Sequence, residues 1–306
     1  MKNSIKWFCK GVIGDLKYCR DLSFDFFNRK NINEKPLIRL DKEGLPSNYT
    51  RPVCFFCNYD KENIIRKNVY HYLNELIQAG FDIVFISTSD IFSNDDLEKL
   101  SKCCIRIIQR ENKGYDFYGW KTGLERYPHY SAHTGLLLAN DSVLGPLFSI
   151  KDIIMKLENC DADIVGMTDC PYIYPHLQSY FLYCKKAVIT SDEFVRFFKQ
   201  VDVLGFKMAI IRKYEVGFSR LLSRRFKLQA LYNLKSVLDQ IPSTEPYTER
   251  PKYRIDPSSQ LWKPLIAELK FPFLKKSILT KRGVSNAEIS AVLAKSNSTY
   301  DVDMLS

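Results

Sequence analysis

The fold of this chain is decided by residues 110–146, which read RENKGYDFYGWKTGLERYPHYSAHTGLLLANDSVLGP. The stretch holds a polar turn at 112–116, a helix-like segment at 120–126 and an apolar run at 135–139 that stops at Asn140, Asp141 and Ser142. An apolar run that ends in a carboxylate and small polar residues is typical of a buried strand. In open α/β sheets ligands bind outside the carboxyl ends of the strands, so we expect Asp141 to lie at a site.

Strands and helices are predicted to alternate along the rest of the chain. Short apolar runs predict strands at 53–57, 81–87, 105–108, 162–167 and 179–184. Helical spacing of apolar residues predicts helices at 64–79, 97–103, 150–158, 192–201, 214–226 and 261–269. This alternation predicts an α/β fold with a mostly parallel central sheet and helices on both faces.

The length of 306 residues suits one large domain with appendages. We expect an N-terminal helical extension and linker at 1–50, the main domain at 51–284, and a polar, loosely ordered C-terminal tail at 285–306. The basic, amphipathic pattern of the first thirty residues fits a helix packed on the main domain or lying on a membrane surface. Prolines among charged residues predict an irregular arm at 31–52.

The composition indicates a cytoplasmic protein with an ordinary core. No window approaches the roughly 20 apolar residues of a membrane span, and the start lacks the apolar core of a signal peptide. The formal net charge of +10 at pH 7 fits nucleic acid, an anionic membrane surface, a phosphorylated substrate or simply a basic surface. No nucleic-acid-binding motif accompanies it.

The nine cysteines form no regular framework. Cys54 and Cys57 make a C-x-x-C, but they lie in a predicted strand, where residues three apart point to opposite faces. A redox pair or a zinc site needs a different context, so buried thiols in a reducing compartment are expected.

A family resemblance is carried by several segments in a fixed order. These read NKGYDFYGWK, ANDSVLGPL, HLQSYFL, KYEVGFS and LWKPLIAELKFPFLKKSIL. Together they resemble the rhamnan synthesis protein F family of bacterial polysaccharide glycosyltransferases, from about residue 53 to about residue 279. The order of NKGYD, helix and GLLLAND also resembles glycosyltransferases with the GT-A fold.

The resemblance implies a GT-A-like nucleotide-sugar-binding fold and an inverting rhamnosyltransferase. The implied donor is dTDP-L-rhamnose, and the implied acceptor is a lipid-linked saccharide of a growing surface polysaccharide, an O antigen or a capsule. Peripheral association with the inner face of the cell membrane fits that acceptor, and no nucleic acid is expected.

The resemblance also suggests roles for acidic residues. Asp141 would bind a divalent metal, Mg²⁺ or Mn²⁺, that bridges the diphosphate oxygens. Many GT-A enzymes have D-x-D where this chain has Asn140-Asp141-Ser142, so metal dependence stays open, and shaping of the turn is the alternative. Glu215 is similar to the base of inverting enzymes, although Val216 replaces a second acid, and Asp169 is the competing base.

The remaining candidates would contact the nucleotide sugar or the acceptor, and each also suits ordinary turn or strand-end chemistry. They lie at the ends of the first two strands, in the polar turn, at the end of the central strand and before the strand at 179–184: Asn58, Asp60, Ser89, Asp90, Asn112, Lys113, Gly114, Asp116, Asn140, His176, Gln178 and Ser179.

A second interpretation belongs to another class of protein. The single carboxylate at 140–142 and the missing second acid after Glu215 fit a non-catalytic binding or scaffolding subunit of a polysaccharide-assembly complex. Nucleic-acid binding ranks third, because charge alone suggests it.

Overall fold

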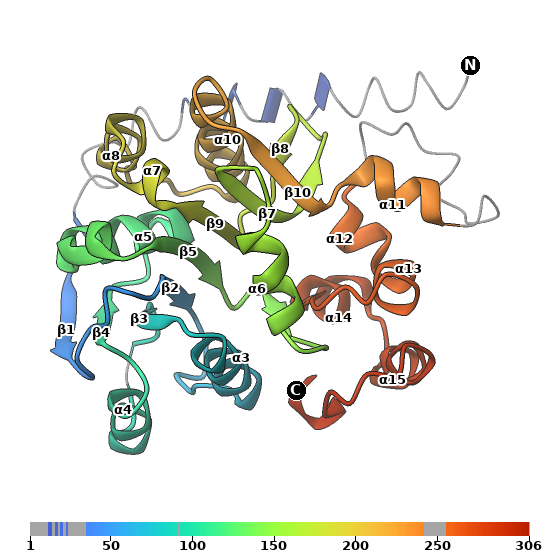
Figure 1. Ribbon diagram of the computed structural model, residues 1–306, viewed down its shortest axis with the longest axis horizontal. Coiled ribbons are helices and arrows are strands. Elements are labelled where there is room, and N and C mark those ends of the chain that lie inside the picture. Colours follow the sequence, from blue (N-terminus) through green and yellow to red (C-terminus); the bar gives the residue numbers. More distant parts are fainter. Residues whose placement is uncertain are drawn as a thin grey trace.

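The computed structural model describes residues 35–90, 92–241 and 255–305, with a few single residues between 12 and 23 (Figure 1). The expected N-terminal helix therefore lies largely outside the described residues. The strands are β1 (Ile38–Glu43), β2 (Val53–Asn58), β3 (Asp82–Ser87), β4 (Arg106–Arg110), β5 (Gly135–Asn140), β6 (Val143–Leu144), β7 (Ile164–Cys170), β8 (His176–Leu177), β9 (Phe181–Lys185), β10 (Leu228–Tyr232) and β11 (Leu274–Lys275).

The described strands form a mostly parallel main sheet in the order β1-β4-β3-β2-β5-β9-β7-β10, with β8 paired to β7. Neighbours from β4 to β5 run parallel, and so do β7 and β10. β9 is antiparallel to both β5 and β7, and β1 is antiparallel to β4. The predicted mostly parallel sheet is confirmed, and the carboxyl ends of β2, β3, β4 and β5 meet at one edge.

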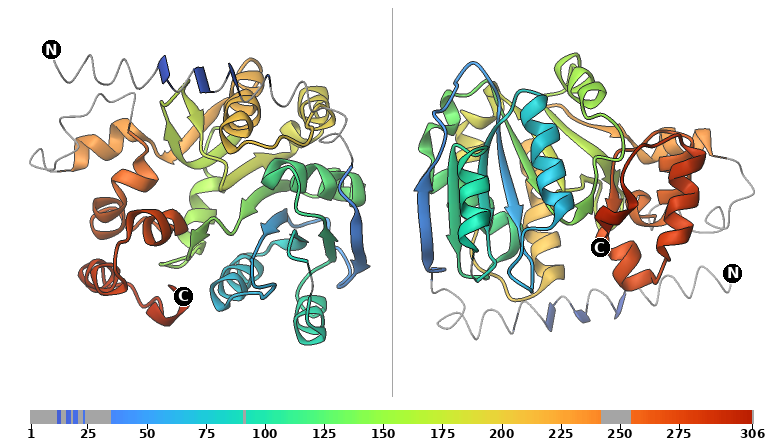
Figure 2. Two further views of the ribbon diagram at one scale, coloured as in Figure 1. Left: turned by 180° about the vertical axis from the view of Figure 1, so that it is seen from behind. Right: turned by 90° about the horizontal axis from the view of Figure 1, so that it is seen from below.

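Helices lie on both faces of this sheet, as predicted (Figure 2). The α-helices are α3 (Lys67–Gln78), α4 (Asn94–Ser101), α5 (Tyr115–Arg126), α6 (Lys151–Glu158), α7 (Lys186–Ile189), α8 (Asp192–Lys199), α9 (Lys207–Ile210), α10 (Val216–Leu222), α11 (Leu234–Gln240), α12 (Pro257–Gln260), α13 (Trp262–Ala267), α14 (Lys276–Arg282) and α15 (Asn286–Lys295). Three further helical segments are η1 (Pro128–Ala132), the π-helical turn η2 (Ile211–Glu215) and η4 (Val302–Leu305).

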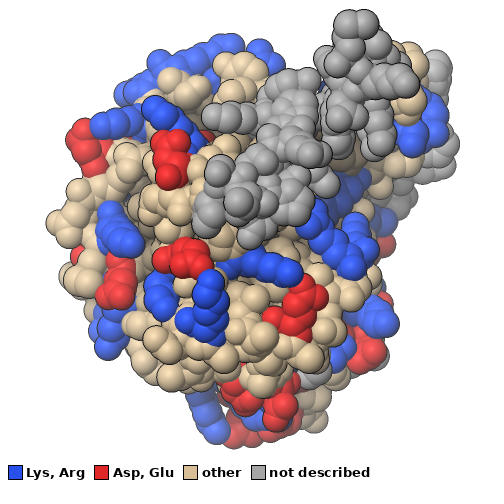
Figure 3. Space-filling view, turned by 90° about the vertical axis from the view of Figure 1, so that its right-hand side faces the viewer, with Lys and Arg blue, Asp and Glu red and all other residues tan. Residues whose placement is uncertain are grey.

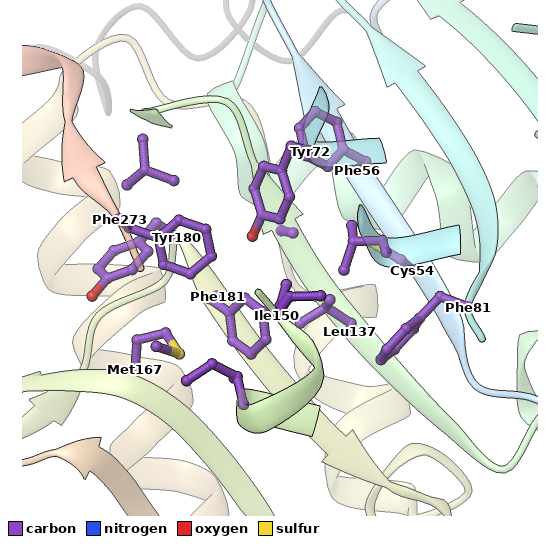
Figure 4. Packing of buried hydrophobic residues seen from close by; sticks show 14 of the residues in the cluster. Cys54, Phe56, Tyr72, Phe81, Leu137, Ile150, Met167, Tyr180, Phe181 and Phe273 are labelled. Atoms are coloured by element: carbon purple, nitrogen blue, oxygen red, sulfur yellow. The ribbon is translucent and has the colours of Figure 1, made fainter. Parts of the chain in front are cut away.

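Alternate residues of the central strands enter two different hydrophobic clusters. Cys54 and Phe56 of β2 pack with α3 and α6, in the cluster of Figure 4, whereas Phe55 and Cys57 pack with α5 on the other face. Because the side chains of a strand alternate between faces, a strand buried on both faces is apolar throughout. The two cysteines of the C-x-x-C are free thiols in different clusters, as the strand assignment predicted.

The C-terminal segment is a correction to the expected loose tail. Residues 286–295 form α15, which begins after Ser285, whose side chain accepts a hydrogen bond from the N–H of Glu288. Ile289 and Leu293 are buried in a third cluster with Leu144 of β6. The segment is ordered because its few apolar residues share one face of a helix.

The arm before β2 is a second correction. Residues 38–43 form β1, which pairs with β4 at the edge of the main sheet. Arg106 of β4 forms a salt bridge with Asp41 of β1 at 2.7 Å. The charged residues that suggested an irregular arm are those of a half-exposed edge strand, where charges are common.

Candidate active site

Two adjoining cavities open at the carboxyl edge of the central strands. The first, of about 510 Å³, is lined by residues that follow β2 and β3 and by the polar turn 112–116. The second, of about 650 Å³, is lined by residues from β5, β8, η2, α12 and α14. Tyr115 and Asp116 line both cavities, so these two residues form the wall between them.

A buried arginine supports the polar turn between β4 and α5 through hydrogen bonds to its main chain. Arg110 is 0% exposed, and its guanidinium donates hydrogen bonds to the carbonyls of Glu111, Lys113 and Tyr115 at 3.0, 2.5 and 2.8 Å. Gly114 and Tyr115 have φ values of 80° and 54°, in the left-handed region. A non-glycine residue in that region is uncommon and persists where its surroundings impose it, often at functional sites.

Asp116 lies in the first turn of α5 and lines both cavities. Its carboxylate accepts a hydrogen bond from the side-chain amide of Asn140, at 3.0 Å. Burial raises the pKa of Asp116 to about 7, and the negative charge of Asp141 adds to this effect, while Lys207 and Arg110 oppose it. Asp116 therefore exchanges a proton near neutral pH, which suits a group that hydrogen-bonds sugar hydroxyls.

Asp141, the expected metal ligand, forms a salt bridge with a lysine side chain of the protein. Its Oδ2 lies 3.0 Å from Nζ of Lys276 and accepts hydrogen bonds from the side chain of Asn58 at 3.1 Å and the N–H of Tyr59 at 3.4 Å. Burial raises the pKa of Asp141, although Lys276 opposes this shift. Asn58 lines the first cavity and Lys276 the second, so Asp141 lies behind the junction of the two.

This arrangement does not match the ligand set of a divalent cation. Such an ion takes several oxygen ligands, whereas an ammonium group occupies Asp141. Within the described ranges, no group of three His, Cys, Asp or Glu side chains is arranged to hold a metal. We therefore propose no catalytic step that involves a metal.

Glu215 lies in the wall of the second cavity, at the end of the π-helical turn η2. Its carboxylate accepts a hydrogen bond from the N–H of Ser179 at 2.7 Å, which joins two predicted site residues. Single π-turns inserted in helices occur frequently at functional sites, because they reorient one side chain relative to the helix.

A network of polar side chains also lines this cavity. Gln178 donates to Asp256 at 3.1 Å, and Ser258 donates to Gln178 at 2.7 Å. Burial alone would raise the pKa of Asp256, but Lys275, at 3.2 Å, and hydrogen bonds from Ser259, Ser258 and Gln178 lower it to about 2. Asp256 is thus a permanent anion whose charge is neutralised by a lysine.

The structure brings most of the predicted site residues together. Those that line one or both cavities are Asn58, Asn112, Lys113, Gly114, Asp116, Asn140, His176, Gln178, Ser179 and Glu215. Five others, including Asp141, are absent from both linings. Asp60 and Asp90 form salt bridges with Arg66 and Arg39, Ser89 bonds the main chain of Asp60, and Asp169 accepts the N–H of Leu234 at 2.6 Å.

Sequence reasoning missed several residues that shape the site. Arg110 ends a strand, where an arginine is usually exposed, and nothing in the pattern marks it as buried. Lys275, Lys276 and Asp256 also line the second cavity. The signal for the two lysines is the family resemblance of the segment LWKPLIAELKFPFLKKSIL, which contains them.

A family model described as "Rhamnan synthesis protein F" matches residues 83–306, more than half of the chain. The chain belongs to the rhamnan synthesis protein F family. This confirms the resemblance that the quoted segments indicated, and the family match includes the turn, the central strand, Glu215 and the lysine pair.

Individual relatives are distant. An uncharacterized protein, y4gN, of Sinorhizobium fredii is 28% identical over 192 residues, which are 60% of this chain and 50% of that protein, so the alignment spans half of the relative's length. Virulence protein VirA of Vibrio anguillarum is 25% identical over 287 residues, 86% of this chain and 88% of VirA.

Among solved structures, the glycosyltransferase GlyE of Streptococcus pneumoniae TIGR4 is similar with a TM-score of 0.35 and 12% identity. The match covers 70% of this chain and 57% of GlyE. This TM-score is too low to indicate a shared fold or function.

The surface shows no single-sign face in the view of Figure 3, where Lys and Arg side chains lie among Asp and Glu. Among the described residues, none of the helices combines the length and the apolar character that crossing a bilayer requires.

Proposed function

We propose that this chain is a glycosyltransferase that transfers a sugar from a nucleotide donor to a saccharide acceptor, and that its sheet is of the GT-A-like class. The observation that carries the proposal is the pair of cavities at the carboxyl edge of the sheet, with Asp116 in the wall they share. Membership of the rhamnan synthesis protein F family supports the reaction class.

The two cavities suit the two parts of the reaction. The first, bounded by Asn58 and the turn at 112–114, takes the nucleotide, because exposed main-chain groups and Lys113 line it. The second takes the diphosphate, the transferred sugar and the acceptor hydroxyl. Asp116, in the wall between them, accepts hydrogen bonds from the sugar.

Glu215 is the base in this mechanism. It removes the proton of the acceptor hydroxyl, whose oxygen then attacks the anomeric carbon from the face opposite the diphosphate. Placement favours Glu215 over Asp169, because Glu215 lines the second cavity and Asp169 is held against the main chain of Leu234. Inversion at the anomeric carbon follows from such a single displacement.

The base assignment is tested by two matched variants. We expect Glu215→Gln to lower the transfer rate by roughly 10²- to 10⁴-fold, the usual worth of a general base, and to leave donor affinity nearly unchanged. Asp169→Asn should retain most of the activity. Retained transfer in Glu215→Gln with loss in Asp169→Asn would assign the base to Asp169 instead.

The finer identity of the reaction is inferred from the family. The proposed donor is dTDP-L-rhamnose, and the proposed acceptor is a lipid-linked saccharide of a bacterial surface polysaccharide, an O antigen or a capsule. An acceptor of this kind would bring the protein to the inner face of the cell membrane as a peripheral protein.

The donor site is tested by calorimetric titration with dTDP-, UDP- and GDP-sugars. We expect selective binding of one nucleotide sugar, with dTDP-L-rhamnose as the first candidate. Absence of binding to every donor would contradict the proposal and favour a scaffolding subunit, which the single carboxylate of the 140–142 segment motivates.

A further inference from the structure

A short second sheet places two lysines beside the end of the central strand. β11 pairs antiparallel with β6, so that Lys275 lies opposite Val143, and the N–H of Lys276 donates to the carbonyl of Ser142 at 2.9 Å. These main-chain bonds fix the backbone of Lys276 next to Asp141. The lysine is therefore positioned by the fold as well as by its side-chain conformation.

Lys276 occupies the position where the resemblance placed a metal ion. Its ammonium contacts Asp141 at 3.0 Å, and its side chain is 32% exposed, whereas the side chain of Asp141 is 13% exposed. A lysine ammonium has three donors. One donor serves Asp141, so the others are available to oxygens of a ligand in the second cavity, which Lys276 lines.

The second cavity is lined by more lysines than acidic side chains. Four lysines line it, Lys207, Lys275, Lys276 and Lys281, together with the acids Asp116, Glu215 and Asp256. Lys275 is paired with Asp256, while Lys207 and Lys281 are exposed at the rim. This is an arrangement that binds a multiply charged anion, and a diphosphate is such an anion.

We propose that Lys276 replaces the divalent metal and that transfer by this chain is metal-independent, an inference that rests on the proposed glycosyl transfer. The acceptor oxygen forms a bond to the anomeric carbon while the bond from that carbon to the diphosphate oxygen breaks. The electron pair of the broken bond goes to the diphosphate, where Lys276 stabilises it, and the proton of the acceptor goes to Glu215. Asp141 positions Lys276.

The test is calorimetric titration of the full chain with dTDP, UDP and GDP, each with EDTA and then with Mg²⁺ or Mn²⁺. We expect the nucleoside diphosphate that binds to have the same Kd, within about twofold, under all conditions. Lys276→Gln should weaken its binding roughly 10- to 100-fold, the usual effect of losing a charged hydrogen-bond donor. Added metal should not restore it.

Three further variants sharpen the test. Lys276→Arg keeps the charge and should bind within about fivefold of wild type, which also covers the case in which Lys276→Gln fails to fold. Asp141→Asn should weaken binding by less than Lys276→Gln does, because Asp141 positions Lys276, and EDTA, Mg²⁺ or Mn²⁺ should leave the binding of this variant unchanged. Lys295→Gln is the matched control, since Lys295 pairs with Glu268 at 2.7 Å on the surface.

The outcomes separate this inference from the proposed function. Binding that disappears in EDTA and returns with Mg²⁺ or Mn²⁺ would overturn the role of Lys276 and leave glycosyl transfer standing. Equal binding by wild type and Lys276→Gln would also overturn it. Absence of binding to any nucleotide under every condition would contradict the proposed function itself, and the inference would fall with it.

Discussion

The carboxyl group of Asp116 lies where the two cavities meet, and its environment raises its pKa. Burial is the main reason that its pKa rises to about 7 from the ordinary value of 3.8, and the charge of Asp141 adds to it. The folded protein therefore binds this proton more tightly than the unfolded chain does. Stability from this proton is fully present below about pH 4 and is lost as pH rises through about 7.

Asp116→Asn should remove this loss of stability. We expect its melting temperature to match that of wild type near pH 4 and to exceed it by a few degrees at pH 8, because the asparagine stays neutral. Differential scanning calorimetry across that range measures the difference. Asp95→Asn, at a position exposed on α4, is the control and should show no gain that grows with pH. A constant difference for Asp116→Asn would contradict the raised pKa.

At the residue scale, the sequence predicts the side chains that line the cavities better than it predicts the side chains that support the backbone around them. Asp116 and Gln178 are predicted because polar residues next to predicted strands and helices suggest sites, whereas Glu215 is predicted from the resemblance to inverting enzymes. Arg110 was missed because burial of an arginine depends on carbonyls supplied by a turn, and a pattern of apolar residues does not describe a turn's carbonyls.

Among the elements, the turn from β4 into α5 is the one on which both cavities depend. Gly114, at a φ of 80°, precedes α5, and a Cβ added there would lie 2.7 Å from the Cβ of Tyr118. The left-handed conformation and the close contact both favour glycine, since an L side chain costs about 1–2 kcal/mol in that region.

Gly114→Ala should lower the free energy of unfolding by at least about 1–2 kcal/mol and weaken nucleotide binding. Gly80→Ala is a matched control, because Gly80 has a φ of 89° and nothing within 4 Å of an added Cβ. We expect Gly80→Ala to lose stability alone, with unchanged binding by calorimetry. Equal binding by both variants would show that the turn does not form the nucleotide site.

At the scale of elements, the long strands and helices could be predicted and the short ones could not. β2, β3 and β5 were found because strands buried on both faces are continuous apolar runs. β6 and β11 have two residues each, too few for any periodicity, and their pairing depends on a contact between distant parts of the chain. The position of Lys276 follows from that pairing, which is why the sequence did not reveal it.

The whole molecule is built on two clusters that sandwich the main sheet and a third cluster that joins the C-terminal helices to it. Leu144, directly after the central strand, packs in the third cluster with Ile289 of α15. α15 thus stabilises the region that carries β11 and Lys276. The class of the fold could be predicted from the alternation of strands and helices. The order of strands and the docking of α15 arise from long-range packing that local patterns do not encode.

Ile289→Ala should lower the free energy of unfolding by about 2–5 kcal/mol, because it leaves a cavity in this cluster. Urea denaturation measures the change. Asn286→Ala, at an exposed position of the same helix, should stay within about 0.5 kcal/mol of wild type. An Ile289→Ala variant as stable as wild type would mean that the segment is the loose tail that its composition suggested.

The central claim is that this protein transfers a sugar from a nucleotide, and turnover of the donor tests it most directly. The measurement is mass spectrometry of reactions that contain the donor selected by titration, with and without lipid-linked saccharides, for wild type and Glu215→Gln. We expect wild type to release the nucleoside diphosphate and to add one sugar to the acceptor, and the variant to do so far more slowly. A folded wild-type protein that binds the donor but never breaks its bond to the diphosphate would contradict the claim and identify a binding subunit instead.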